Sequence, residues 1–191
     1  MPLLLPVAAP AEQEINLISA DNTLVPAFGD GEQELLRKGT RYEIQFDMGE
    51  MDYVEALDWT DLTTKGDTVV MAVYQPGLVV GAPGAPRVNG PGQSGRGLTI
   101  DGLSDGYVVR KGQFLSVVTQ GRRFLYRARA TVTAAGGTAV VPLQTLLRFP
   151  PGDNDVVELE QPMIEGWARD VSGLRIIANH NVQVSFTVRE R

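Results

Sequence analysis

Polar and apolar residues alternate strictly in two long stretches of the chain, residues 41–48 and residues 182–188. Because side chains on a strand point alternately to its two faces, this period predicts two half-buried β-strands. A third stretch, residues 68–74, is apolar almost throughout, so we expect a strand inside a sheet with both faces covered. The apolar residues that share a face in the two alternating strands are Tyr42, Ile44, Phe46 and Met48, and Val182, Val184, Phe186 and Val188.

Residues 52–65 have helical rather than β spacing. The apolar stripe of this segment is formed by Met51, Val54, Leu57 with Ala56 beside it, and Leu62. Lys65 falls in the expected last turn and Gly66 at the expected C-terminal cap, where the helix dipole and backbone geometry favour them. Trp59 lies off the stripe, so it packs under a loop of its own chain or contacts another subunit.

The middle of the chain is richer in turn-forming residues. Residues 81–97 contain six glycines and three prolines. Such a stretch cannot continue a helix or a central strand, so we expect it to connect two units. After it, turn signals recur every ~8–12 residues, which is the spacing of a small antiparallel barrel or meander.

These patterns predict a mainly β chain with an inserted unit. We expect residues 1–80 and 151–191 to form a β-sandwich with one α-helix, and residues 81–150 to form a small β-barrel inserted into it. A short strand at 23–25, followed by a turn at 29–31, should precede the first long strand.

The chain is acidic, with a formal net charge of −6. A surface that binds duplex DNA needs a basic stripe to neutralise phosphates, and only short basic clusters occur here. One cluster contains Arg122, Arg123, Arg127 and Arg129, and its alternation puts the last three on one strand face. We interpret this cluster as a solvated face or a source of salt bridges between subunits, and contact with nucleic acid is the less favoured alternative.

The N-terminal segment is apolar, but two prolines interrupt it and it lacks a basic region, so it does not resemble a signal peptide. Exposing Leu3, Leu4 and Leu5 would be costly, so we expect this segment to dock on a neighbouring subunit. No stretch approaches the ~20 apolar residues that span a bilayer. We therefore expect no membrane insertion.

Residues that carry chemistry are few. The sequence has no cysteine, which excludes disulfides, thiolate nucleophiles and cysteine-ligated metal sites. His180 is the only histidine, and its place at an expected turn favours a solvent-facing residue over a catalytic one. Asp153 and Asp155 could share a calcium ion, but a polar loop with side chain–backbone hydrogen bonds is favoured.

Two further patterns are weighed against catalysis or cofactor binding. Glu158 and Glu160 share a strand face, which is more typical of a solvated face than of paired catalytic acids. The glycine spacing at 90–95 matches a dinucleotide fingerprint only by letter, because no helix follows it. We predict no catalytic residue, cofactor or metal site, and we expect the chain not to be an enzyme.

A series of motifs carries a resemblance to a known family. In chain order they occupy residues 39–46, 88–95, 98–103, 109–116, 125–134, 137–143 and 146–148. Their order and spacing resemble the distal tail proteins of long-tailed bacteriophages. The chain departs from the family's pattern at Gln113, where an acid is usual, and at Leu146, where proline is usual. The resemblance covers about residues 38–188 and is strongest over 88–160.

This resemblance implies a tail-tube-like β-sandwich with an inserted barrel, assembled as a homo-hexameric ring at the tail tip of the virion after synthesis in the host cytoplasm. The ring would join the tail tube protein to the hub or baseplate proteins and to receptor-binding or fibre proteins. DNA would only pass through its lumen, and an acidic lumen would let it pass without sticking. The interface residues that we expect are Leu3, Leu4, Leu5, Trp59, Arg122, Arg123, Arg127 and Arg129.

Two other interpretations remain open. The chain could be another phage ring or adaptor, such as a tail terminator, a tube protein or a fibre-attachment protein, and a copy count per particle would separate these. It could also be a carbohydrate-binding β module, whose candidate aromatic residues would be Trp59, Trp167, Tyr107 and Tyr126. A glycan array would test that second alternative.

Overall fold

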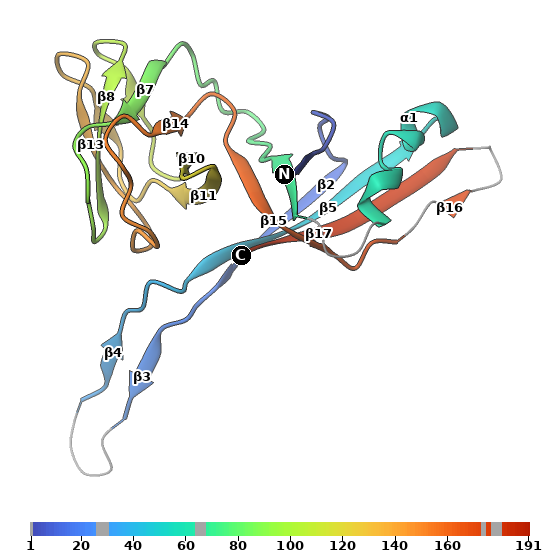
Figure 1. Ribbon diagram of the computed structural model, residues 1–191, viewed down its shortest axis with the longest axis horizontal. Coiled ribbons are helices and arrows are strands. Elements are labelled where there is room, and N and C mark those ends of the chain that lie inside the picture. Colours follow the sequence, from blue (N-terminus) through green and yellow to red (C-terminus); the bar gives the residue numbers. More distant parts are fainter. Residues whose placement is uncertain (1, 26–30, 64–67, 173–174, 177–180) are drawn as a thin grey trace.

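The computed structural model confirms a mainly β fold, with 51% of residues in strands and 4% in helices. Two large sheets, with two hydrophobic clusters between them, form the body, and a two-stranded arm projects from it (Figure 1). No helix within the described parts of the chain is long and apolar enough to cross a membrane. The structure describes residues 2–25, 31–63, 68–172, 175–176 and 181–191.

The first unit is a curled seven-stranded sheet built from both ends of the chain. All of its strand pairs are antiparallel except one, in which residues 3–4 run parallel to residues 69–70. In spatial order the strands are β1 (Leu3–Leu4), β6 (Thr68–Ala72), β15 (Met163–Arg169), β17 (Val182–Glu190), β5 (Arg41–Met51) and β2 (Glu12–Ile18), with β16 (Arg175–Ile176) paired to β17.

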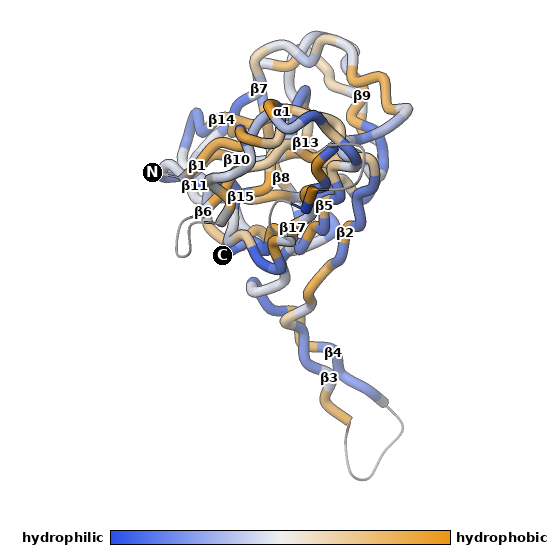
Figure 2. Tube along the Cα trace, turned by 90° about the vertical axis from the view of Figure 1, so that its right-hand side faces the viewer, coloured by the Kyte–Doolittle hydropathy of each residue, from blue (hydrophilic) through white to orange (hydrophobic). Residues whose placement is uncertain are grey.

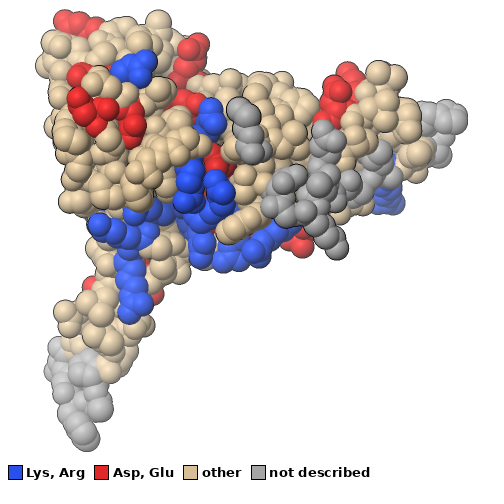
Figure 3. All heavy atoms as spheres, in the orientation of Figure 1, with Lys and Arg blue, Asp and Glu red and all other residues tan. Residues whose placement is uncertain are grey.

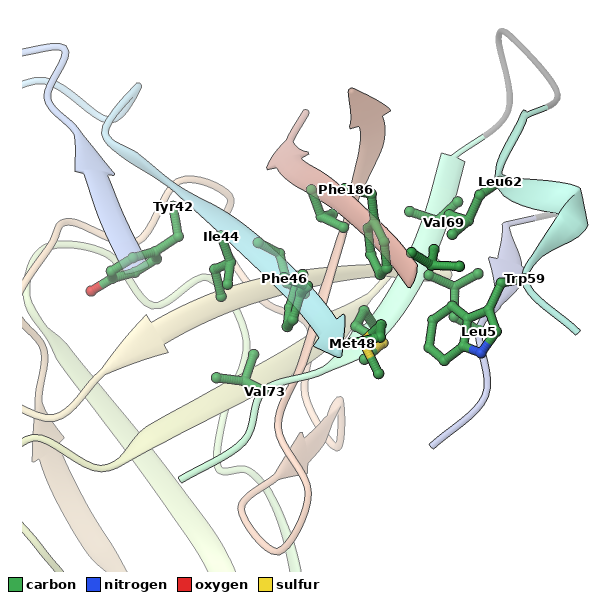
Figure 4. Packing of buried hydrophobic residues seen from close by; sticks show 14 of the residues in the cluster. Leu5, Tyr42, Ile44, Phe46, Met48, Trp59, Leu62, Val69, Val73 and Phe186 are labelled. Atoms are coloured by element: carbon green, nitrogen blue, oxygen red, sulfur yellow. The ribbon is translucent and has the colours of Figure 1, made fainter. Parts of the chain in front are cut away.

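The apolar faces predicted for β5 and β17 meet in the core of this sheet (Figure 4). Phe46 of β5 stacks on Phe186 of β17 with ring centroids 5.3 Å apart. The apolar strand β6 is buried on both faces, as expected, because Val69 and Met71 point into this core while Val70 is buried on the opposite face. Strict alternation was therefore sufficient to assign the buried faces.

The helical segment is shorter than expected. Residues 53–57 form α1 (Tyr53–Leu57), and after a break residues 60–63 form the 3₁₀ turn η1 (Thr60–Thr63). The prediction of one continuous helix over 52–65 is wrong. Lys65 and Gly66, expected at its end, lie outside the described residues.

Spacing explains the break. The residues that face the core are Ala56, Trp59 and Leu62, three positions apart, which suits the three-residue turn of a 3₁₀ helix. The backbone follows that period, since Trp59 N–H donates to the oxygen of Ala56 and Leu62 N–H to the oxygen of Trp59. Val54 and Leu57, which belonged to the expected stripe, are 75% and 44% exposed.

The second unit is a small barrel inserted between β6 and β15. The bridge between Ala128 and Leu143 brings the two ends of its sheet together. In spatial order its strands are β11 (Arg122–Arg127), β10 (Phe114–Thr119), β14 (Val156–Glu158), β7 (Gly84–Val88), β8 (Gly97–Leu103) and β13 (Ala139–Pro142), with β9 (Val108–Val109) paired to β12 (Val132–Thr133) beside them. Residues 156–158, expected in the outer unit, thus pair with the barrel strands β10 and β7.

The two units share part of one core. Most of the barrel's apolar residues form their own cluster, but Phe114 and Leu125 pack into the core of the seven-stranded sheet. Phe114 meets Tyr42 edge to face, with ring centroids 5.5 Å apart. The barrel and the helical segments therefore supply the second layer over the buried face of the sheet.

Candidate assembly surfaces

The arm is the feature with the least support from its own chain. It is formed by β3 (Asn22–Leu24) and β4 (Gln33–Leu35), which pair only with each other within the described residues. Figures 1 and 2 both show it extending away from the body, and Figure 2 shows both hydrophobic and hydrophilic residues along it. The exposed fractions of its apolar side chains are 46% for Leu24, 69% for Val25, 36% for Leu35 and 43% for Leu36.

Two physical properties make this arm a candidate contact surface. An isolated two-stranded hairpin is marginally stable in water, and large exposed apolar residues mark surfaces that contact other molecules. The short strand expected at 23–25 is confirmed as β3, whereas residues 29 and 30 of the expected turn lie outside the described residues.

The two segments that lead into the arm are hydrogen-bonded to each other. Asp21 Oδ1 accepts the N–H of Arg37 at 2.7 Å, and its Oδ2 accepts the hydroxyl of Ser19 at 2.8 Å. These bonds, with the N–H of Arg37 first, lower the pKa of Asp21 below its ordinary value. Thr40 adds a bond from Ala20 N–H at 3.2 Å. The bonds from Arg37 N–H and Ala20 N–H therefore hold the two segments together at the base of the arm.

The N-terminal segment docks on its own chain. Leu3 and Leu4 pair with Val69 and Val70, and Leu5 N–H donates to the oxygen of Val70 at 3.0 Å. Leu5 is 3% exposed and Leu3 packs against the core, whereas Leu4 is 60% exposed. Docking of this whole segment on a neighbour is therefore replaced by strand pairing within the chain, and only Leu4 presents its side chain outward.

Trp59 adopts the first of its two expected placements. It is 4% exposed and its ring lies 5.7 Å from that of Phe186, so its side chain is not available to another subunit (Figure 4). Tyr126, another aromatic residue considered for sugar binding, is 1% exposed inside the barrel. Of that set, Trp167 is the most exposed, at 38%.

The four clustered arginines do not form one surface. Arg122 stacks over the ring of Phe124 at 5.3 Å, while Arg123 pairs with Glu158 at 3.1 Å. Arg127 and Arg129 are exposed beyond them. Arg123 and Arg127 do share one face of β11, as expected, but Arg129 lies past the end of the strand.

Arg123 and its neighbours lie at the junction between barrel and sheet. The N–H of Arg123 donates to Glu165 Oε2 at 3.0 Å, and the N–H of Leu125 donates to Glu190 Oε1 at 2.8 Å. These N–H groups lie at alternate residues of β11, the first strand in the order of the barrel sheet. Two buried glutamates of β15 and β17 thus accept bonds that a neighbouring strand would otherwise accept.

Each of these glutamates has a charged partner. Glu165 accepts from Arg191 at 2.6 Å, and Glu190 pairs with Arg148 and also accepts the N–H of Tyr42 at 2.7 Å. Burial raises the pKa of Glu190, and the guanidinium of Arg148 opposes that rise. Figure 3 shows Lys and Arg side chains gathered where the barrel, the sheet and the arm meet.

This pair of glutamates was missed by sequence reasoning. For Glu190 a signal existed, because it continues the buried phase set by Val182, Val184, Phe186 and Val188. Glu158, expected on a solvated face, is half-buried and also accepts the hydroxyl of Ser116. The prediction of a solvated face is wrong for Glu158, because its carboxylate contacts Arg123 of β11 and Ser116 of β10.

The remaining candidates for chemistry have structural contacts. Asp153 Oδ1 accepts Gly90 N–H at 2.9 Å, and Asp155 Oδ2 accepts the Thr119 hydroxyl at 2.6 Å and Gly152 N–H at 2.7 Å. Among the described residues, no group of three or more histidine or acidic side chains is placed to hold a metal ion. His180 lies outside the described residues.

No family model matches the chain, and no curated protein matches it at a level that shows a relationship.

Proposed function

We propose that the chain is a structural subunit of a bacteriophage tail. Copies of it form a ring at the distal end of the tail tube, and the ring connects the tube to the hub or baseplate and to the receptor-binding proteins. The observation that carries this proposal is the projecting arm, whose apolar side chains lie outside both hydrophobic cores. A subunit that functions alone has no use for such an arm, whereas a repeating assembly gives it a surface to cover.

The open edge of the seven-stranded sheet also supports an assembly of repeated copies. β2 is the last strand of the seven-stranded sheet, with seven residues and no partner on its outer edge among the described strands. Open edges invite pairing with another chain, and closing a ring of β subunits is one way to satisfy them.

The charge on this edge fits a conduit for DNA. Glu12 and Asp47 lie directly opposite each other on β2 and β5, and Glu14 follows on the same face. All three are exposed. An acidic strip of this kind, placed on the lumen of a ring, would repel the phosphates of passing DNA rather than bind them.

Light scattering of the purified protein over a range of concentrations tests the assembly. We expect the mass of a closed ring, and we expect the double substitution Val25→Ser and Leu36→Ser to shift the protein toward the monomer. Val79→Ser is the matched control, because Val79 is 84% exposed and lies off the arm. A wild-type protein that stays monomeric at every concentration contradicts the proposed self-assembly.

Antibody labelling of phage particles tests the position. Gold label at the tail tip in electron micrographs is the expected result. Label along the whole tail would identify a tube protein instead, and particles without label would contradict a tail component altogether.

A further inference from the structure

A groove between the barrel and the sheet is cationic, whereas the chain as a whole is acidic. It consists of two adjoining hollows of about 590 Å³ and about 420 Å³. The two share Lys111, Gly112 and Arg127 in their walls. The larger hollow has an apolar wall that includes Ile15 and Leu78.

The charged side chains in this groove are all cationic. Lys111, Arg127 and Arg129 line it, and no acidic residue is among its described lining residues. None of the three forms an ion pair with an acidic side chain within the described chain. In a protein with a net charge of −6, three unpaired cations beside an apolar wall form a site for a partner that is both acidic and apolar.

The groove is built before any partner arrives. Arg127 Nε donates to the oxygen of Gly112 at 3.0 Å, and its guanidinium lies 5.2 Å from the ring centroid of Phe114. The N–H of Lys111 donates to the hydroxyl of Thr131 at 3.0 Å. A partner would therefore meet a positioned wall and would not have to order it.

The arm has the complementary surface. The register pairs Thr23 with Glu34, so these two residues share a face of the arm. The same alternation, continued one residue past the strand ends, adds Val25, Glu32 and Leu36 to that face. The described parts of residues 22–36 contain no basic residue. All five side chains of this face are exposed. Figures 1 and 2 show the arm projecting from the body. Glu34 and Leu36 line a separate hollow with Arg96 and Gln144 of their own chain, but none of the five side chains of this face lines the cationic groove.

We propose that the acidic face of the arm of one copy lies in the cationic groove of a second copy. Glu32 and Glu34 face Lys111 and Arg129, and Val25 and Leu36 of the same face lie against the apolar wall beside Phe114. This inference rests on the proposed self-assembly and names the two surfaces that would carry it.

The absence of cysteine from the sequence gives a direct test. One copy carries Glu34→Cys and a second, differently tagged copy carries Lys111→Cys, and the two are mixed under conditions in which the wild type assembles and treated with a bismaleimide cross-linker. We expect a cross-linked pair that contains both tags. Val140→Cys in place of Lys111→Cys is the control, since Val140 is 57% exposed but lines neither hollow.

A charge swap gives a second readout. Glu32→Lys with Glu34→Lys, or Lys111→Glu with Arg129→Glu, should each weaken self-association at least roughly tenfold, and a chain that carries all four substitutions should recover it. Arg127 is left unchanged because it also supports Phe114 and Gly112. Self-association of the wild type should weaken as salt is raised.

The outcomes separate the two proposals. Assembly of the wild type without the specific cross-link and without rescue by the charge swap overturns the groove assignment and leaves the ring. A wild type that does not self-associate overturns the assembly proposal and this inference together.

Discussion

The carboxylate of Glu190, the penultimate residue, accepts the backbone N–H of Leu125 at 2.8 Å across the junction of the two units. The same side chain accepts the N–H of Tyr42 and pairs with Arg148. A single buried glutamate of β17 thus connects β5, β11 and the segment after β13.

Replacing Glu190 by Gln should lower the free energy of unfolding by about 3 kcal/mol, because the buried guanidinium of Arg148 loses its counter-charge. Urea unfolding followed by circular dichroism measures it. Arg189→Gln is the control, since Arg189 pairs with Glu43 at 3.8 Å on a solvent-exposed face and should cost less than about 1 kcal/mol. Equal losses for both variants would show that Glu190 has no special role at the junction.

Gly166→Ala should destabilise the seven-stranded sheet by about 3 kcal/mol or more. A Cβ at this position would lie 2.0 Å from the backbone oxygen of Arg189, and a backbone neighbour in a paired strand cannot turn aside. Gly97→Ala is the matched strand control, because its nearest contact would be a side-chain carbon at 3.8 Å. Thermal unfolding of both variants decides whether the close approach of β15 and β17 is as tight as the structure has it.

The two tryptophans should respond differently to a soluble quencher. In Trp167→Phe the fluorescence comes from Trp59, and we expect blue-shifted emission with weak acrylamide quenching because Trp59 is 4% exposed. In Trp59→Phe the remaining Trp167 is 38% exposed and should be quenched readily. Strong quenching of Trp59 in the folded protein would contradict its place in the core.

The base of the arm should loosen in acid. The folded-state pKa of Asp21 lies below its ordinary value of 3.8, so its bond from Arg37 N–H contributes fully above that value and is lost as the pH falls through the lower folded pKa. Chemical shifts of the Arg37 amide, followed by NMR during an acid titration, report this change. Asp21→Asn removes the titrating group, so its Arg37 amide should show no corresponding step.

The sequence predicted the buried faces of strands, where side chains repeat every two residues, but not that of the helical segment, where they repeat every three or four. The faces of β5 and β17 followed from alternation alone, because both sides of a strand are assigned by the same period. Of the predicted helical stripe, Ala56 and Leu62 do face the core, but Val54 and Leu57 do not, and Trp59, which was placed off the stripe, does. Helical spacing shows which apolar residues share a face of the helix, but it does not show which face another element will cover.

The assembly surfaces were predictable only in part. Arg127 and Arg129 were singled out by their charge, and both line the cationic groove. Lys111 could not be grouped with them, because the pairing of Ala128 with the loop before β10 brings distant positions together. The carboxylates at the junction were hidden for the same reason, since their donors come from a strand about 40 to 65 residues away in sequence.

Strands β6 and β15 are antiparallel neighbours, and Val73 N–H donates to the oxygen of Pro162 where they leave the sheet. For the seven-stranded sheet, residues 73–162 therefore occupy the place of a single hairpin turn. A different domain could replace residues 73–162 between these two strands without altering the register of either strand. A replacement domain would have to meet two conditions: it must supply two backbone donors and a guanidinium to the carboxylates of Glu165 and Glu190, and apolar side chains in place of Phe114 and Leu125.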